Sequence, residues 1–480
     1  MPILTATPSQ TPVIVIGAGK QAIHTSYLKY SVIILLFIFF SLASVSSVSA
    51  QSPSIKDLLL SWLTSIQDRN GDSKVNSLDF ASLLSLSPTP TPSGPTSTPI
   101  PISGNSRGYV TTPGELLYVK QKAASGVEPY KSAKDTVISY ANNSLRTFNA
   151  PDAQCSRQND YWYNSYTIEA KAIAYWLTGD TNYATQVVAG LRDATAHPAS
   201  RLPSGNGDQC NLNAAWYPPG VVIAADLMEG YSGWSASDKQ AFQNYLANSV
   251  YPFAAASGRN SNNWGTGGDM SSAYIADYLW NRSDLRLTTL DNTPRSPAQA
   301  YEFHAQRQIG RINGTYIYNS ACPLDPGIRA DGGLSEELER GSTGCYGTTL
   351  LACDASWTYS ITSLESVIMH AELLWRRGSG DRRIYDNVGP NGKGQLKKAI
   401  LFVVNSSCDW KDSHKHSLEL TFRYYRDTDT ACSLGVTSGS GCRSGRYIGD
   451  HCGSMMHYGT ISHGFAVGEN PGPPPRVPAP

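Results

Sequence analysis

Paired helices that recur along most of the 480-residue chain constrain the fold more than any other feature of the sequence. In YTIEAKAIAYWLTGDTNYATQVVAGLRDA, residues 166–194, apolar side chains recur at the three- and four-residue spacing that places them on one face of a helix. Gly179 supplies a helix C-terminus, after which the same spacing resumes. The residues that carry the pattern are Ile168, Ala172, Tyr175 and Trp176 before the glycine, and Tyr183, Val187 and Leu191 after it.

A second helix pair follows in residues 218–251, PPGVVIAADLMEGYSGWSASDKQAFQNYLANSVY. Pro219 is expected to open the first helix, and Ser235 with Asp238 forms a variant capping box for the second. Gly230 and Gly233 break the chain between them. Antiparallel helix pairs joined by tight turns predict an all-α fold, an incomplete α/α toroid or a solenoid, in which short loops on one side build the cleft.

The cysteines and an apolar segment near the N-terminus together indicate where the protein is found. All nine cysteines follow residue 150. Residues 31–50 hold an apolar run that ends in a small-residue cleavage site, as in a signal peptide, and the run is short for a membrane-spanning helix. Export favours disulfides over metal sites and predicts a secreted, extracellular or periplasmic protein, although the segment is alternatively an uncleaved membrane anchor. The odd count leaves one cysteine unpaired, and the pairing stays open within the clusters Cys345/Cys353 and Cys432/Cys442/Cys452.

A calcium-binding loop is predicted in DRNGDSKVNSLD, residues 68–79, which apolar helical segments flank. Its oxygen donors fall at positions 1, 3, 5, 7, 9 and 12 of an EF-hand loop, the spacing that wraps one Ca²⁺. The loop resembles one repeat of a dockerin module, with Ser73 where the turn glycine is usual. Because only one repeat is present, we expect a calcium-stiffened spacer with structural Ca²⁺, and a cohesin-like partner is the alternative. The predicted ligands are Asp68, Asn70, Asp72, the Lys74 carbonyl, Asn76 and Asp79.

These features predict five segments. They are a signal peptide or N-terminal membrane anchor (1–50), a calcium-binding helix-loop-helix repeat (51–87), a Pro/Thr-rich linker (88–104), a helical catalytic domain (105–465) and a Pro-rich tail (466–480).

The stretch NSNNWGTGGDM, residues 260–270, is the first candidate for chemistry. Asn262 and Asn263 are neutral donors, Trp264 offers a face for sugar stacking, and three glycines follow. We expect a loop on which the amides clamp a carboxylate while the glycines let the backbone approach a sugar. The alternative for the two asparagines is a turn that only caps a loop.

Three segments together resemble the alginate lyase family, the α/α-toroid polysaccharide lyases, and the resemblance spans residues from about 110 to 465. AYWLTGDTNYATQ is similar to the family's first helix pair. NNWGTGGDMSSAY falls where the family has Asn-Asn-His. The most specific segment is DGGLSEELERG followed by WTYSITSLESVIMHAELL, which resembles Asp-Gly-x-Leu…Glu-Leu-x-Arg-Gly and then Tyr-x-x-x-x-Leu.

The resemblance implies cleavage of a 4-linked uronic acid polymer by β-elimination, without a catalytic cofactor. The substrate is then an acidic polysaccharide, and the equal counts of 38 basic and 38 acidic residues give no sign of a nucleic acid partner. Neutral amides and a guanidinium must first hold the substrate carboxylate, because the C5 proton is barely acidic beside an anion. Carried over, Asn263 and Arg340 neutralise the carboxylate and Tyr359 donates a proton. Asn262, Trp264 and Glu337 are assigned to substrate binding.

Trp264 stands where the family has a proton-transferring histidine, and an indole cannot act as a base. One interpretation is that Tyr359 is both base and acid. Free tyrosine has a pKa of about 10, so this role requires a nearby cation, for which Arg340 is the candidate. Syn elimination by one tyrosine favours mannuronate over guluronate. The other interpretation is that a remote histidine takes part: His304, His370, His451 or His457.

Two other classes of protein remain as alternatives. A toroidal glycoside hydrolase would use Glu337 with Asp331 or Asp269 as its two carboxylates. A polysaccharide-binding protein would have lost the catalytic base but would still bind the polymer. Tyr359 is then a core residue, and Arg340 only a salt-bridge partner of Glu336, Glu337 or Glu339.

Overall fold

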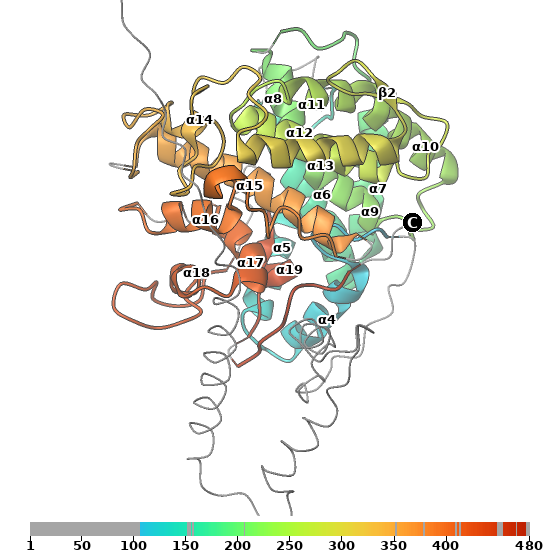
Figure 1. Cartoon of the computed structure of the whole chain (residues 1–480). Helices are drawn as coiled ribbons and strands as arrows, with labels where there is room; N and C mark the ends of the chain where they lie inside the picture. Colours follow the sequence, from blue (N-terminus) through green and yellow to red (C-terminus); the bar gives the residue numbers. More distant parts are fainter. Residues whose placement is uncertain are drawn as a thin grey trace, which may run out of the picture. The chain divides into compact units, whose positions relative to one another are not determined.

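Helices make up nearly all the regular structure of the computed structural model (Figure 1). The structure describes residues 106–476 except 151–154, 156–157, 206, 351–352, 378–379, 409, 412–413, 449–454 and 467. The predicted signal segment, calcium-binding repeat and linker lie outside the described residues, as does His451. The helices in the first half of the described chain are α4 (Pro113–Ala124), α5 (Tyr130–Ala141), α6 (Gln158–Thr178), α7 (Thr181–Ala196), α8 (Gln209–Trp216), α9 (Pro218–Leu227), α10 (Ala236–Tyr245), the π-helix η1 (Leu246–Val250), α11 (Tyr251–Ser257) and α12 (Asn263–Tyr278).

Two short strands, β1 (Leu287–Thr288) and β2 (Pro294–Arg295), pair antiparallel after α12. The remaining helices are α13 (Pro297–Asn313), α14 (Ser335–Leu338), α15 (Ala355–Arg376), the 3₁₀ turn η2 (Pro390–Gly392), α16 (Leu396–Val404), α17 (Lys415–Tyr425), α18 (Thr428–Ser433) and α19 (Gly459–His463).

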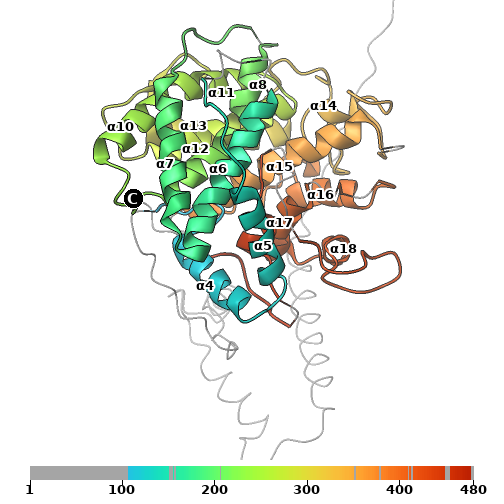
Figure 2. The ribbon, with the colours of Figure 1, turned by 180° about the vertical axis from the view of Figure 1, so that it is seen from behind.

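The helix ends follow local signals in the sequence. The α6–α7 turn has Gly179 at φ +84° and Asp180 as the N-cap of α7, with its carboxylate accepting from the Asn182 amide at 2.9 Å. Ser235 caps α10 and accepts from the Asp238 amide at 3.2 Å. All four helices form in the predicted segments. The first pair is confirmed, since α6 and α7 lie side by side (Figure 2), whereas α9 and α10 do not pack on each other as a pair: both pack against α7.

Helices α6, α9, α12, α15 and α17 pack in a circuit and run parallel. Near their starts, the Ser165 hydroxyl of α6 donates to the Tyr217 carbonyl before α9 at 2.7 Å. Near their ends, the Trp176 indole donates to the Leu227 carbonyl at 3.0 Å. The other neighbouring helices are joined in the same way, by one contact toward their starts and one toward their ends. Trp216, just before α9, contacts Asn263 of α12, and Glu229, just after α9, contacts Tyr278 of α12. The corresponding contacts are Thr266 with Ser363 and Asp277 with Arg377 for α12 and α15, and His416 with Glu365 and Tyr424 with Glu372 for α15 and α17.

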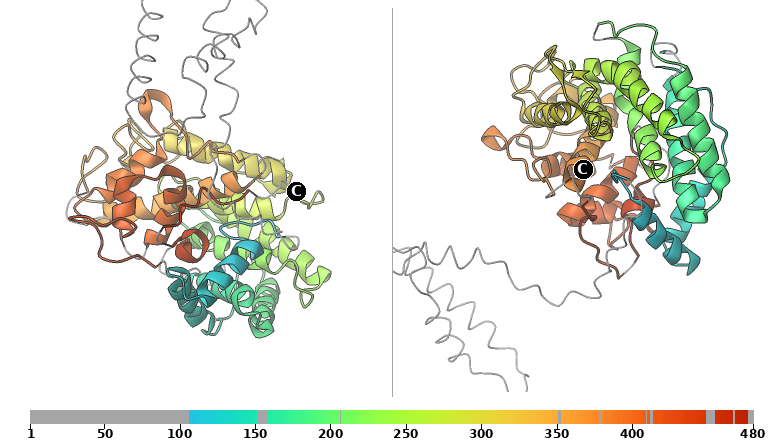
Figure 3. Two further views of the ribbon diagram at one scale, coloured as in Figure 1. Left: turned by 90° about the horizontal axis from the view of Figure 1, so that it is seen from below. Right: turned by 90° about the vertical axis from the view of Figure 1, so that its right-hand side faces the viewer.

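The circuit returns to its beginning through the C-terminal segment. Thr460 of α19 donates to Glu419 of α17 at 3.0 Å, and the Tyr458 hydroxyl donates to the Tyr166 carbonyl of α6 at 3.0 Å. Helices α7, α13 and α16 pack against α6, α12 and α15. The right-hand view of Figure 3 shows the helices curving around a centre in sequence order. The predicted all-α toroid is thus the observed architecture of the described residues, and the N-terminal ends of α6, α9, α12, α15 and α17 all lie at one end of it.

Eight of the nine cysteines pair within the described residues. The remaining one, Cys452, lies outside those residues. In the described part of the chain, no helix is long and apolar enough to cross a membrane. Four disulfides agree with an extracellular or periplasmic protein. They are Cys155–Cys210, Cys322–Cys345, Cys353–Cys408 and Cys432–Cys442.

The C-terminal segment that follows α19 packs onto the helical unit. Lys122 of α4 pairs with Glu469 at 2.6 Å, and the Trp375 indole donates to the Pro474 carbonyl at 2.9 Å. The described residues of the predicted Pro-rich tail, which begins at residue 466, are therefore held by α4 and α15 of the helical domain.

Candidate active site

The asparagine pair begins helix α12 at the end of the toroid where the parallel helices start. Asn262 is the N-cap, and its side-chain oxygen accepts from the Trp264 amide at 3.1 Å. Asn263 is the first helical residue, and its side chain is fully buried. Its Oδ1 accepts from Arg340, while its Nδ2 is buried without a partner. Capping accounts for Asn262, whereas the orphaned donor of Asn263 is costly in a buried place and keeps Asn263 a candidate for contact with a ligand.

Arg340 connects Asn263 to Tyr359, although the three residues come from separate elements. Its Nη1 donates to Asn263 Oδ1 at 2.7 Å, and its guanidinium carbon lies 4.0 Å from the centroid of the Tyr359 ring. Tyr359 is in the first turns of α15, which Asp354 caps by accepting from the Ser356 amide at 2.9 Å. The Arg340 side chain keeps 25 % of its surface exposed, so it remains within reach of a ligand.

Glu337 lies behind this cluster, one helical turn before Arg340. It is 1 % exposed, and neither carboxylate oxygen has a hydrogen-bond partner of good geometry, although the Asn263 backbone N–H and the Arg340 guanidinium lie close enough to favour its ionised form. The nearest separation from Arg340, Glu337 Oε2 to Nη1, is 3.6 Å, longer than a good hydrogen bond. Burial raises the pKa of the Glu337 carboxyl to about 8, against the opposing effect of Arg340. At neutral pH the side chain is therefore mainly a neutral acid.

The glycines after Trp264 have a different role from the one predicted. They belong to the buried first turns of α12 and do not form a loop. A Cβ on Gly265 would lie 1.8 Å from the Asn260 carbonyl oxygen, and one on Gly268 would lie 2.7 Å from that of Ala254. The prediction that they let the backbone approach a sugar is wrong, because the close neighbour is the protein's own backbone.

Of the four remote histidines considered as catalytic groups, the three that the structure describes are all buried. His304 faces Asp269 at 2.9 Å through Nδ1 and the Tyr251 hydroxyl at 2.9 Å through Nε2. His457 faces Glu169 at 2.7 Å. His370 has no hydrogen-bond partner, and burial lowers its pKa to about 3. Each is at 0 % exposure, as Asn263 is, so burial alone does not separate these histidines from the candidate site.

A histidine pair that the sequence interpretation missed lies at the start of α17. His414 Nδ1 and His416 Nε2 face the two oxygens of the buried Glu365 at 3.1 and 3.2 Å. Of the two, only the His414 side chain keeps any exposure, 7 %. The signal for them was the His-Lys-His spacing directly before an amphipathic helix.

The carboxylates required by a glycoside hydrolase are engaged elsewhere. Asp269 is fully buried and pairs with Arg311 at 2.7 Å, which together with Arg307 holds the pKa of this carboxyl well below its usual range despite burial. Asp331 pairs with Arg329 at 2.6 Å. These two residues and the buried Glu337 do not form an open pair across a cleft, which argues against that alternative.

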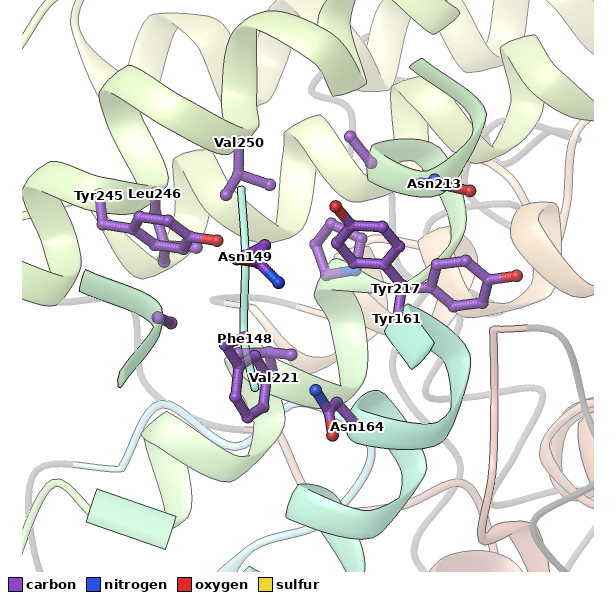
Figure 4. Close-up of a pocket in the computed structure, with 13 residues that line it drawn as sticks. Phe148, Asn149, Tyr161, Asn164, Asn213, Tyr217, Val221, Tyr245, Leu246 and Val250 are labelled. Carbon is purple, nitrogen blue, oxygen red and sulfur yellow. The ribbon is translucent and has the colours of Figure 1, made fainter. Parts of the chain in front are cut away.

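The described residues also line cavities away from this cluster. An open one of about 480 Å³ is lined by Asp331, Lys398 and Phe402. A mainly apolar pocket of about 50 Å³, between α6, α8, α9 and η1, is lined by Tyr161, Asn213 and Tyr217 (Figure 4). It is far below the roughly 300–1,000 Å³ of pockets that bury small ligands. Across the described residues, the only cluster of potential metal ligands is Cys155, Asp208 and Cys210, in which the two cysteines form a disulfide.

Comparisons with known proteins find similarity only among solved structures. No family model matches the sequence, and no curated protein matches it. A variant of alginate lyase A1-III complexed with a tetrasaccharide is similar with a TM-score of 0.48 and 13 % identity, over 77 % of this chain and 99 % of that one. An alginate lyase from Bacteroides ovatus is similar with a TM-score of 0.43 and 16 % identity, over 63 % of this chain and 83 % of that one.

Alginate lyase A1-III from Sphingomonas species A1 is similar with a TM-score of 0.41 and 14 % identity, over 64 % of this chain and 76 % of that one. All three are described as alginate lyases or variants of one. At this level of similarity they assign no activity to this chain.

Proposed function

We propose that the protein is a polysaccharide lyase that cleaves a 4-linked uronic acid polymer by β-elimination. The observation that carries the proposal is the contact of Arg340 with both Asn263 and Tyr359. A guanidinium and an amide supply neutralising donors for a carboxylate, and the adjacent phenol supplies a group that moves a proton.

The surroundings of this cluster also favour an anion. Helices α6, α9, α12, α15 and α17 begin at the same end of the toroid, and each helix N-terminus carries partial positive charge. Asp269 and Asp331 bring little opposing charge, because each is paired with an arginine. A polymer with one carboxylate on every sugar fits such an end of the molecule.

In the proposed mechanism, Arg340 and Asn263 hold the substrate carboxylate and stabilise the enediolate that develops on it. Tyr359 takes the C5 proton, and the electron pair of that bond forms the C4–C5 double bond. The C4–O bond breaks and its oxygen receives the proton from Tyr359. One tyrosine then serves as base and acid on the same face, which favours mannuronate over guluronate, and Trp264 provides a stacking surface.

The experiment that tests the proposal is the ultraviolet absorbance of unsaturated uronate ends. The panel is alginate, polymannuronate, polyguluronate and glucuronan, with Arg340→Ala as the inactive control. Growth of absorbance on any polymer supports a lyase. Release of reducing ends without absorbance indicates a hydrolase, and binding with neither product indicates a polysaccharide-binding protein.

Secretion and structural calcium belong to the same proposal, supported by the apolar run in residues 31–50 and the oxygen-rich loop at residues 68–79. A mature, exported enzyme meets polymeric substrate outside the cell, and a single calcium-binding repeat acts as a spacer. A cohesin-like partner requires more than this one repeat.

A further inference from the structure

Glu337 is the one group in the candidate site whose chemistry the proposed mechanism does not use. Its carboxylate is buried beside the Asn263–Arg340 contact, and neither oxygen makes a hydrogen bond of good geometry. Arg340 Nη1 lies 2.7 Å from Asn263 Oδ1 but 3.6 Å from Glu337 Oε2. The guanidinium therefore favours a neutral amide over an adjacent carboxylate, the reverse of what charges alone would produce.

Neutral Glu337 explains this preference. A buried, unpaired carboxylate is strongly disfavoured, whereas a protonated carboxyl is tolerated in the same place. The charged groups near it are Arg340, Glu336 and Arg311. Glu336 accepts from the Ala321 amide at 3.0 Å, and Arg311 is paired with Asp269 at 2.7 Å, so Arg340 is the cation left for Glu337.

Space around Glu337 lets its carboxyl change state without unfolding the site. A cavity of about 20 Å³ is lined by Glu337, Arg311, Thr266 and Ser363. This volume is enough for one water molecule, which requires roughly 10–15 Å³. The carboxyl has room to move there, and a shift of less than 1 Å brings Oε2 from 3.6 Å to the roughly 2.7–2.9 Å of a charge-assisted hydrogen bond with Arg340.

We propose that Glu337 is a positioning residue that must be protonated for the protein to bind its acidic substrate. Neutral Glu337 leaves the charge of Arg340 to the substrate carboxylate, and ionised Glu337 competes for the same guanidinium. The inference rests on the proposed function, because it names the carboxylate of a uronate as the competitor.

The competition has a defined signature in the kinetics. If only the protonated form binds, the apparent KM rises about tenfold for each pH unit above the pKa, while kcat for bound substrate stays constant. With a Glu337 pKa of about 8, KM at pH 9 is expected to be about tenfold above its neutral value. A group that transfers protons would instead change kcat.

The test measures kcat and KM on polymannuronate between pH 6 and 10 for the full chain and for Glu337→Gln. Glutamine never ionises, so the alkaline rise in KM should disappear in this variant, even where its overall activity is lower. Glu339→Gln is the matched control, since Glu339 is exposed on the same segment and its variant should keep the rise. Glu337→Met, similar in volume and also unable to ionise, repeats the test if the glutamine variant does not fold.

An alkaline rise in KM that persists in Glu337→Gln or Glu337→Met overturns the inference, as does a wild-type KM that is flat to pH 9.5. Failure of the proposed function is separate from this. If no polymer is cut, the dissociation constant of polymannuronate oligomers is measured over the same pH range. Its rise in the wild type and its constancy in Glu337→Gln support the role of Glu337 in a binding protein, and absence of binding at every pH overturns it.

Discussion

Arg340→Ala removes the residue that connects the two other catalytic candidates. The substitution deletes the donor at 2.7 Å from Asn263 Oδ1 and the cation at 4.0 Å from the Tyr359 ring centroid. In the proposed mechanism it also deletes the charge that holds the substrate carboxylate. Catalysis and stability should respond very differently.

The expected loss in turnover exceeds the expected loss in stability. Removing one donor that stabilises an oxyanion lowers kcat by about a hundred- to a thousandfold, or roughly 3–4 kcal/mol. The stability loss combines about 1.5 kcal/mol for a hydrogen bond to a charged group with about 0.5–1 kcal/mol for a partly exposed cation–π contact. That sum of about 2–2.5 kcal/mol is well inside the 5–15 kcal/mol by which domains are normally stable.

The assay follows unsaturated uronate ends by absorbance, with helical circular dichroism and thermal unfolding of the same samples. Arg382→Ala is the matched control: Arg382 lies over the Trp375 ring at 5.8 Å and pairs with Asp386, beyond the other end of α15. It should lose comparable stability and keep its turnover. Arg340→Lys should recover little, because an ammonium does not reproduce a planar fork. An Arg340→Ala protein that is folded and cleaves at more than a tenth of the wild-type rate would refute the assignment.

The remaining predictions concern the proton-transfer group, the sugar platform, a buried acid and calcium. Tyr359→Phe should lower kcat by several orders of magnitude with little change in KM, whereas Tyr425→Phe, which loses a 2.7 Å bond to a carbonyl, should lower only stability. Trp264→Ala should raise KM more than it lowers kcat, by roughly 1–3 kcal/mol if sugar stacking is comparable to base stacking, and the pH–rate profile should lack a limb near 6.5 if no histidine takes part. Because the Glu337 pKa is raised to about 8, its proton stabilises the fold below about pH 4.5 and this contribution is lost as pH rises to 8. The unfolding free energy of the wild type should therefore fall relative to Glu337→Gln by about 1.4 kcal/mol per pH unit in that window, as denaturant titrations can measure. Calorimetry on residues 51–88 should show roughly one Ca²⁺ bound, and chelation should leave the activity of the full chain intact; no heat of binding would contradict the calcium loop.

Local features of the fold could be predicted because their causes lie within a few residues. Gly179 with Asp180 ends one helix and starts the next, and Ser235 caps α10 through the amide three residues later. Apolar spacing indicated which face of each helix is buried. The choice of a toroid followed from the repetition of such pairs.

The role of the glycines after Trp264 could not be predicted from neighbouring residues alone. Their spacing was equally consistent with a loop beside a sugar and with a helix packed tightly on its neighbour. Only the positions of the Asn260 and Ala254 carbonyls decide between them, and those positions depend on how α11 and α12 pack.

The sequence by itself determined which residue types are available for the chemistry: paired amides, an arginine and a tyrosine in motifs that resemble a lyase. The tertiary structure alone decided that Arg340 meets Asn263 across 77 residues of chain and that its guanidinium lies over Tyr359. It also decided that Glu337, one of three glutamates within four residues, is buried beside them without a hydrogen bond of good geometry. The physical reason is that capping and periodicity act through neighbouring residues, whereas contact, desolvation and charge pairing depend on which distant helices pack together.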